Sequence, residues 1–341
     1  MKKGDNVARK FRWGILGTGV MAKNFAEGLA IIPDAELVAV GSRNCNTAEE
    51  FAKTYNVPRA YSSYKDLAED DSVDAVYIST PNTYHKDNSL LCLQSQKHVL
   101  CEKPFTINAY EAEEVIICAR KNKLFLMEAM WTRFLPTIVK LRGLLTDGVI
   151  GEVRMLFADF GFQGDCNPKG RLLNPELGGG SLLDVGVYTL SFTSMVLGTP
   201  DRVCSLASFG ATGIDEQGGY ILGYPGGQLA VLASAMRVMT PQSATIVGTE
   251  GYIQIERFWY ATKMLMNAKG RDPEVIELPI EGNGYNYEAQ EVMNCVCEGK
   301  LESDVISLDE SLSIIRIMDK IREQWDLEYP SETPPFNDYH S

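Results

Sequence analysis

Apolar and polar positions in the first part of the chain form short segments of two alternating kinds. Brief apolar runs with the length of buried strands occur at 11–18, 36–41, 73–78, 99–101 and 124–127. Between them, the segments at 22–29, 47–55, 84–95 and 108–121 have the spacing and cap residues of helices. Regular alternation of strand and helix predicts a parallel sheet with right-handed crossovers. Residues 10–130 are therefore expected to form a doubly wound α/β domain.

The pattern changes from Gly151 onward. Strand-like segments follow one another with short turns, and Tyr224-Pro225-Gly226-Gly227-Gln228 reads as a hairpin turn. Helices are expected only after Pro136, near Ser181, and at 286–298 and 308–324. Residues 131–330 thus predict an α+β domain on a large, open, mostly antiparallel sheet. An uncovered sheet face needs a partner, so we expect a homodimer or higher homo-oligomer through that sheet.

Local signals suggest where several of these helices begin. Thr47-Ala48-Glu49-Glu50 has the form of a capping box, and Asn108 precedes Glu111 at the same spacing. Ser181 follows three glycines and can cap the helix that contains Asp184 and Tyr188. These positions give the expected starts of three helices.

Composition narrows the class of protein. The 341 residues are 45% hydrophobic, no apolar run reaches the roughly 18 residues of a membrane span, and no apolar segment follows the basic start. A cytoplasmic protein without a membrane partner is expected. The net charge of −13 disfavours nucleic acid, whose phosphates attract basic surfaces, and suits a neutral or locally steered small substrate.

Cysteine and histidine usage gives no sign of a metal centre. The eight cysteines are scattered, mostly in apolar segments, so free thiols are expected rather than disulfides. The three histidines, His85, His98 and His340, have no partner pattern typical of zinc or of a Ser-His-Asp site. We therefore predict no metal.

The first predicted strand runs into Gly17-x-Gly19-x-x-Ala22, which opens a helix. This is the dinucleotide-binding fingerprint in its required context, with a strand before it and a helix after it. The glycines allow a tight turn and let the backbone approach a pyrophosphate, which the helix N-terminus attracts. The alternative, an accidental glycine turn, does not explain this context.

The second strand ends at Ser42-Arg43, without the acidic residue that commonly holds the ribose of NAD. An arginine at this place suits a 2′-phosphate, so NADP is predicted and NAD stays possible. The alternative is that Arg43 is an ordinary solvated loop residue.

Two further strand ends carry polar residues that folding does not require. One strand stops at Thr80-Pro81-Asn82, and another stops at Glu102-Lys103-Pro104. Because open α/β sheets bind ligands at the carboxyl ends of their strands, Lys103 is expected to face the nicotinamide and a substrate hydroxyl. The alternative for Lys103 is a surface salt bridge with Glu102.

The segment from Gly178 to Tyr188 supplies the other candidate chemistry. Asp184 and Tyr188 are four residues apart and share one helical face. Alcohol oxidation needs a base, and a phenol with a pKa near ~10 needs a nearby ammonium to act as one. Lys103 can supply that charge, and Asp184 can orient the lysine or a substrate hydroxyl. The alternative is an exposed Asp184 and a half-buried Tyr188.

Taken together, these features resemble the glucose-fructose oxidoreductase / inositol dehydrogenase family along nearly the whole chain. The runs 126–134 and 183–188 are most similar to its dimeric dihydrodiol dehydrogenase (NADP D-xylose dehydrogenase) group. The resemblance implies a Rossmann domain and an open-faced sheet domain that dimerises. It also implies a cis Lys103-Pro104 bond and catalysis by Lys103 and Tyr188 beside Asp184. The expected cofactor-binding residues are Gly17, Thr18, Gly19, Val20, Met21, Ser42, Arg43, Thr80, Pro81, Asn82, His85, Glu102, Lys103, Trp131 and Arg133.

Three functions compete at this point. The first is an NADP-dependent dehydrogenase of a pyranose such as xylose or of a cyclic trans-dihydrodiol. Its expected substrate residues are Trp131, Phe160, Phe162, Asp184 and Tyr188, although such aromatics are often plain core. The second is a non-catalytic NAD(P)-binding sensor on the same fold, which has no need of the lysine, aspartate and tyrosine together. The third, a biliverdin-type reductase, would need a broader and more basic pocket.

Overall fold

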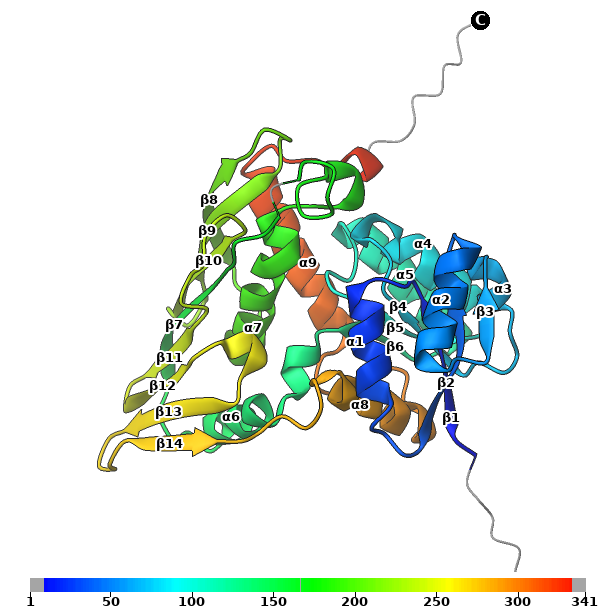
Figure 1. The fold of residues 1–341 in the computed structure, drawn as a ribbon. Coiled ribbons are helices and arrows are strands. Elements are labelled where there is room, and N and C mark those ends of the chain that lie inside the picture. The colour runs from blue at the N-terminus through cyan, green and yellow to red at the C-terminus, as the bar shows by residue number, and fades with distance from the viewer. Residues whose placement is uncertain (1–8, 166, 333–341) are drawn as a thin grey trace, which may run out of the picture.

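The computed structural model describes residues 9–165 and 167–332. Two sheets stand apart, and helices fill the space between them (Figure 1). Cys166, His340 and the first residues of the chain lie outside the described part.

The first sheet is the predicted doubly wound sheet. Its six strands are all parallel in the order β3-β2-β1-β4-β5-β6. The strands are β1 (Phe11–Leu16), β2 (Ala35–Gly41), β3 (Arg59–Tyr61), β4 (Ala75–Ile78), β5 (His98–Glu102) and β6 (Leu126–Ala129). The helices between them are α1 (Val20–Leu29), α2 (Cys45–Tyr55), α3 (Tyr64–Ala68), α4 (His85–Gln94) and α5 (Ala109–Asn122). The order reverses between β1 and β4, which makes a ligand-binding crevice at their carboxyl ends.

Burial explains why the central strands are continuous apolar runs. All four residues of β4 are buried, as expected for a parallel strand with helices on both faces. Phe25 of α1 stacks on Tyr77 of β4 with ring centroids 3.8 Å apart. This contact fixes α1 over the sheet, and with it the glycine turn that precedes the helix.

Of the three predicted cap residues, Asn108 is confirmed, whereas Thr47 and Ser181 do not cap their helices. Asn108 caps α5 as predicted, accepting a hydrogen bond from the backbone N–H of Glu111. Thr47 does not cap α2, because Asn44 accepts from the N–H of Asn46 and the helix begins before Thr47. Asparagine and threonine both cap well, so sequence spacing alone could not decide between them.

The second sheet has eight strands in the order β14-β13-β12-β11-β7-β10-β9-β8. Only the β7–β10 pair is parallel, so the sheet is mostly antiparallel, as predicted. The strands are β7 (Val153–Gly161), β8 (Arg202–Phe209), β9 (Asp215–Gly223), β10 (Leu229–Ala235), β11 (Ala244–Gly248), β12 (Gly251–Ile255), β13 (Lys263–Ala268) and β14 (Glu274–Glu277).

One face of this sheet is covered and the other is bare. The helices α6 (Pro136–Thr146), α7 (Val187–Leu197) and α9 (Leu308–Glu323) lie on the side that faces the first sheet (Figure 1). No described helix lies on the outer side, where Phe157, Leu206, Ile221 and Val231 are exposed.

The C-terminal helices return to the first sheet. Helix α8 (Tyr285–Cys297) packs against α1, and α9 packs against α5 and β6. The domain division at 130/131 therefore stays a prediction, because later residues complete the first layer.

The stretch Pro175–Leu197 is apolar and long enough to cross a membrane, but 78% of its apolar window is buried in the core. The described cysteines are free thiols; Cys92, Cys101 and Cys295 are buried, whereas Cys45, Cys204 and Cys297 are exposed.

Candidate active site

A cavity of about 540 Å³ lies over the carboxyl ends of β1, β2, β4 and β5. Thirteen of the predicted cofactor-binding residues line it: Gly17, Thr18, Gly19, Val20, Met21, Ser42, Arg43, Thr80, Pro81, Asn82, His85, Glu102 and Lys103. They come from segments far apart in sequence and meet because parallel strands end at one edge of the sheet.

The glycine turn fits a dinucleotide. Gly17 has a φ of +105°, and a Cβ there would stand 2.8 Å from the carbonyl oxygen of Ser79. A Cβ on Gly19 would meet nothing within 4 Å, so the space over the start of α1 is open. The first residue of that helix, Val20, is 68% exposed. The N-terminus of α1 can therefore receive a pyrophosphate.

Arg43 lies at one end of this cavity. Its guanidinium carbon stands 5.1 Å from the ring centroid of Tyr84, and Tyr64 lines the same corner. Ser42 is held by a 2.7 Å hydrogen bond between its hydroxyl and that of Thr47. The Thr47 hydroxyl thus stabilises the loop that carries Ser42 and Arg43 and does not cap α2. No ion pair of Arg43 with a described carboxylate is present, so its charge is free for a ligand.

Lys103 lies where this cavity meets a second one. Its Nζ donates to the backbone carbonyl of Asp184 at 2.8 Å and lies 3.4 Å from Oδ1 of the same residue. Glu102 accepts instead from the Tyr77 hydroxyl and from the backbone N–H of Lys103. The salt bridge with Glu102 is thus not formed, and the Lys103-Pro104 bond is cis, as the resemblance implied.

Arg171 completes this junction and was not predicted. Its NH1 donates to Oδ1 of Asp184 at 2.7 Å, and it lines both cavities. Burial raises the pKa of Asp184, but Lys103 and Arg171 outweigh it and leave that pKa lowered. Asp184 is therefore a buried carboxylate that holds two cations together.

The helix that carries Asp184 begins with a π turn at Leu182–Gly186. Ser181 does not cap it, because its backbone is already helical and its hydroxyl donates to Asp215. The same carboxylate accepts from the N–H of Leu182 at 2.7 Å. A side chain from β9 thus supplies the cap, which a local sequence pattern could not reveal. π turns are frequent at functional sites.

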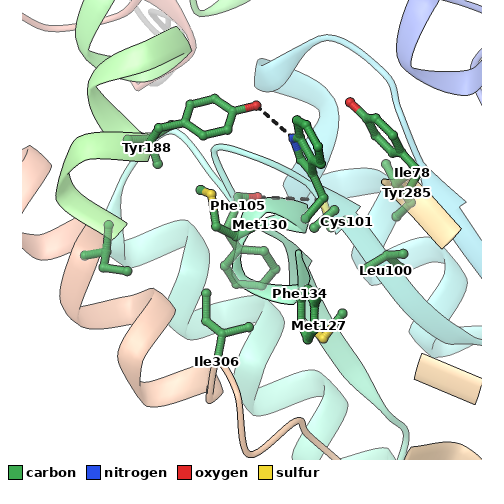
Figure 2. Close-up of a cluster of buried hydrophobic side chains, with 14 of the residues drawn as sticks. Ile78, Leu100, Cys101, Phe105, Met127, Met130, Phe134, Tyr188, Tyr285 and Ile306 are labelled. Carbon is green, nitrogen blue, oxygen red and sulfur yellow. Dashed lines mark hydrogen bonds between the residues drawn. The ribbon is translucent and has the colours of Figure 1, made fainter. Parts of the chain in front are cut away.

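Tyr188 faces the same junction from α7. The Nζ of Lys103 lies 4.9 Å from the ring centroid of Tyr188. The Trp131 indole N–H donates to the Tyr188 hydroxyl at 3.2 Å, the hydrogen bond marked by the dashed line at Tyr188 in Figure 2. Burial raises the pKa of Tyr188 and outweighs the opposing charge of Lys103. The phenol is therefore protonated in this structure, and Lys103 alone does not make it a base. Both Asp184 and Tyr188 are buried, contrary to the alternative of an exposed Asp184 and a half-buried Tyr188.

The second cavity, of about 440 Å³, has walls of aromatic side chains. All five predicted substrate residues line it: Trp131, Phe160, Phe162, Asp184 and Tyr188. Trp131 stacks on Tyr285 with centroids 5.0 Å apart, and Phe160 stacks on Trp259 at 5.1 Å. Tyr188 and Tyr285 of this lining lie next to the buried cluster that contains Phe105, Met130 and Phe134 (Figure 2).

Two predicted cofactor residues lie elsewhere. Trp131 lines only the second cavity. Arg133 lines neither; its buried guanidinium donates to Ser191 and pairs with Glu310 at 2.7 Å, so it ties the β6 loop to α7 and α9. Neither residue lines the first cavity, so the assignment of Trp131 and Arg133 to cofactor binding stays a prediction without support from this geometry.

His85 has a supporting position. Its ring nitrogens lie 2.8 Å from the Pro104 carbonyl and 2.9 Å from the Thr80 carbonyl, so it joins two of the ligand-facing strand ends. Burial lowers its pKa to about 4. Sequence reasoning missed several lining residues because they come from loops of the second domain or the end of the chain: Arg171, Arg257, Trp259, Tyr260, Asn283 and Tyr285.

Comparison with known proteins agrees with this geometry. Residues 11–130 match the oxidoreductase family model with an NAD-binding Rossmann fold, and residues 138–254 match the GFO/IDH/MocA C-terminal domain. The chain is 38% identical to trans-1,2-dihydrobenzene-1,2-diol dehydrogenase of Xenopus tropicalis, over 94% of this chain and 99% of that one. The human protein of that name is 36% identical over 94% of this chain and 98% of its own.

Solved structures share the whole architecture. An aldose-aldose oxidoreductase from Caulobacter crescentus is 26% identical, with a TM-score of 0.85 over 92% of this chain and 97% of its own. A 3-ketoreductase from Actinomadura kijaniata, in complex with NADP and TDP-benzene, is 25% identical, with a TM-score of 0.83 over 92% and 98%. The chain therefore belongs to the GFO/IDH/MocA family of oxidoreductases, and its first domain is an NAD(P)-binding Rossmann fold.

Proposed function

We propose that this protein is an NADP-dependent oxidoreductase that transfers a hydride between the nicotinamide and a secondary alcohol. The alcohol belongs to a pyranose such as xylose or to a cyclic trans-dihydrodiol. One observation carries the proposal: Lys103, Asp184 and Tyr188 meet where a dinucleotide-sized cavity joins an aromatic one. A bound nicotinamide supplies or accepts the hydride.

Tyr188 transfers the proton, and Lys103 stabilises the charge on the reacting oxygen. Because Trp131 donates to the Tyr188 hydroxyl, the phenolic proton is free to point into the cavity. A protonated phenol suits donation to a carbonyl oxygen during reduction, and the reverse reaction returns the proton to Tyr188 Oη. Burial lowers the pKa of Lys103, but the negative charge that Tyr188 carries as a phenolate and the Asp184 carboxylate outweigh burial and leave that pKa raised. The ammonium therefore persists and stabilises the negative charge that develops on the oxygen.

The cofactor preference rests on Arg43. It lies at the end of the second strand, where no acidic residue competes for the ribose, and its guanidinium has no carboxylate partner among the described residues. A 2′-phosphate would be held there by charge-assisted hydrogen bonds.

The substrate class rests on the aromatic cavity and on the relatives. Flat aromatic walls suit the face of a sugar ring or of an arene diol. The relatives named above include a dihydrodiol dehydrogenase and an aldose-aldose oxidoreductase. A cytoplasmic location stays a prediction.

Turnover separates this proposal from a sensor on the same fold. We expect the purified protein to reduce NADP in the presence of D-xylose or a trans-dihydrodiol. This reduction is measured as the absorbance of the reduced nicotinamide. Tight NADP binding without turnover of any sugar or diol in a broad panel would favour the sensor.

A further inference from the structure

Arg257 is the cation of the aromatic cavity that has no acidic partner within the described chain. The other two cations that line this cavity, Lys103 and Arg171, both contact Asp184. The guanidinium of Arg257 makes no ion pair or side-chain hydrogen bond with a described residue. Its contacts are two aromatic rings, with centroids 5.4 Å away in Trp259 and 5.8 Å away in Tyr260.

The backbone holds Arg257 in an uncommon conformation. Its φ of 46° lies in the left-handed region, which few residues other than glycine adopt. The turn that follows is anchored by Gln242, whose carbonyl accepts from the N–H of Phe258 at 3.1 Å. The Gln242 side chain also accepts from the indole N–H of Trp259 at 2.9 Å. The fold therefore sets the backbone of Arg257 at the rim of the cavity, and its exposed side chain lies against the rings of Trp259 and Tyr260.

Local charge does not explain this arginine. Its neighbour Glu256 pairs with Lys263 at 3.0 Å and leaves Arg257 unpaired. Glu27 also lines the cavity, but it forms no ion pair with Arg257. A guanidinium with free donors, packed on aromatic rings, is suited to two parallel hydrogen bonds with a carboxylate.

We infer that the natural substrate is a pyranose or cyclic diol that carries a carboxylate remote from the reacting carbinol, and that Arg257 binds this carboxylate. The inference rests on the proposed function and names the substrate class of the same site. A monoanion is favoured over a phosphate dianion, because Glu27 and the net charge of −13 oppose a second negative charge.

The test compares sugars that differ only at carbon 6. D-glucuronate, D-glucose and D-glucose 6-phosphate are titrated into the NADP complex and followed by tryptophan fluorescence, since Trp131 and Trp259 line the cavity. The same titrations are made with Arg257→Gln and with Arg271→Gln, which removes an exposed arginine from the turn between β13 and β14. Turnover of each sugar is measured in parallel.

We expect wild-type protein to bind D-glucuronate about tenfold to a hundredfold more tightly than D-glucose. Arg257→Gln should remove this preference and leave D-glucose binding unchanged, whereas Arg271→Gln should keep it. Equal binding of the two sugars by wild-type protein, or an equal loss of both in Arg257→Gln, would overturn the inference. Tighter binding of D-glucose 6-phosphate than of D-glucuronate would show that the site prefers a phosphate and would overturn the assignment of a carboxylate. Absence of turnover together with selective D-glucuronate binding would refute the proposed enzyme and leave the anion site standing.

Discussion

At the scale of single residues, the site combines charges whose roles depend on their neighbours. Asp184 stays ionised because Lys103 and Arg171 both contact it, whereas Tyr188 stays protonated because burial outweighs the lysine. The residue types and the strand ends that carry them could be predicted. Arg171 could not, because it comes from a long loop whose path is set by tertiary contacts.

Arg43 gives the sharpest single-residue prediction. Arg43→Ala removes the charge expected to hold the 2′-phosphate, so the dissociation constant of NADP should rise about tenfold or more while that of NAD changes little. Titration of both cofactors into the wild-type and variant proteins measures this. Arg43→Lys serves as a control that keeps the charge. An equal loss of affinity for NADP and NAD would remove Arg43 from 2′-phosphate binding.

At the scale of elements, buried side chains join pieces that are distant in sequence. Glu128 of β6 accepts from the backbone N–H of Phe105 at 3.1 Å and from the Ser311 hydroxyl of α9 at 2.7 Å. It thereby holds the loop after Lys103 against the C-terminal helix. Burial raises the pKa of Glu128 to about 7.

This raised pKa predicts how stability depends on pH. The folded state binds the Glu128 proton more tightly than the unfolded state, in which the pKa of Glu128 has its ordinary value of 4.5. The contribution of Glu128 to the stability of the fold therefore falls as the pH rises from about 4.5 to 7. Glu128→Gln mimics the neutral acid. The free energy of unfolding of the variant, measured with denaturant relative to that of the wild type, should therefore increase by on the order of 3 kcal/mol between pH 4.5 and pH 8.

Glu50, which is exposed on α2, provides the matched control. The stability difference between Glu50→Gln and wild type should not change with pH in this way. A constant difference for Glu128→Gln across the same range would show that Glu128 is ionised throughout.

The elements themselves were largely predictable, because strands with four buried residues in a row and capped helices leave strong local patterns. One exception has a tertiary cause: the π turn at Leu182–Gly186 and its cap by Asp215 depend on β9, which follows later in the chain. The other is local: Asn44 rather than Thr47 caps α2, and the Thr47 hydroxyl bonds to that of Ser42 instead.

At the scale of the whole molecule, the two sheets make a cleft with one wall from each. Lys103 follows a strand of the first sheet, while Asp184 and Tyr188 come from the helical segment that covers the second. The site exists only when these layers pack together. α8 and α9 reinforce this packing by returning to the first sheet, an arrangement that linear domain boundaries did not anticipate.

The bare face of the second sheet predicts self-association. Phe157, Val231 and Ile221 lie side by side across β7, β10 and β9 on this face and are 41%, 38% and 50% exposed. Wild-type protein is expected to form a homodimer or larger assembly through this sheet. Val231→Lys would place a charge in the interface, where burying it is costly. The mass of this variant in light scattering should therefore fall toward that of the monomer.

Val139→Lys places the same charge on an exposed position of α6, away from the sheet, and should leave the mass unchanged. A monomeric wild-type protein at micromolar concentration would contradict this interface.

Lys103, at the junction of the two cavities, is proposed to act in hydride exchange. Lys103→Met tests this role when its turnover and NADP affinity are measured beside those of the wild type. We expect turnover of D-xylose or a trans-dihydrodiol to fall at least about a hundredfold while NADP affinity stays nearly intact. Turnover equal to that of the wild type would contradict it and remove Lys103 from the mechanism.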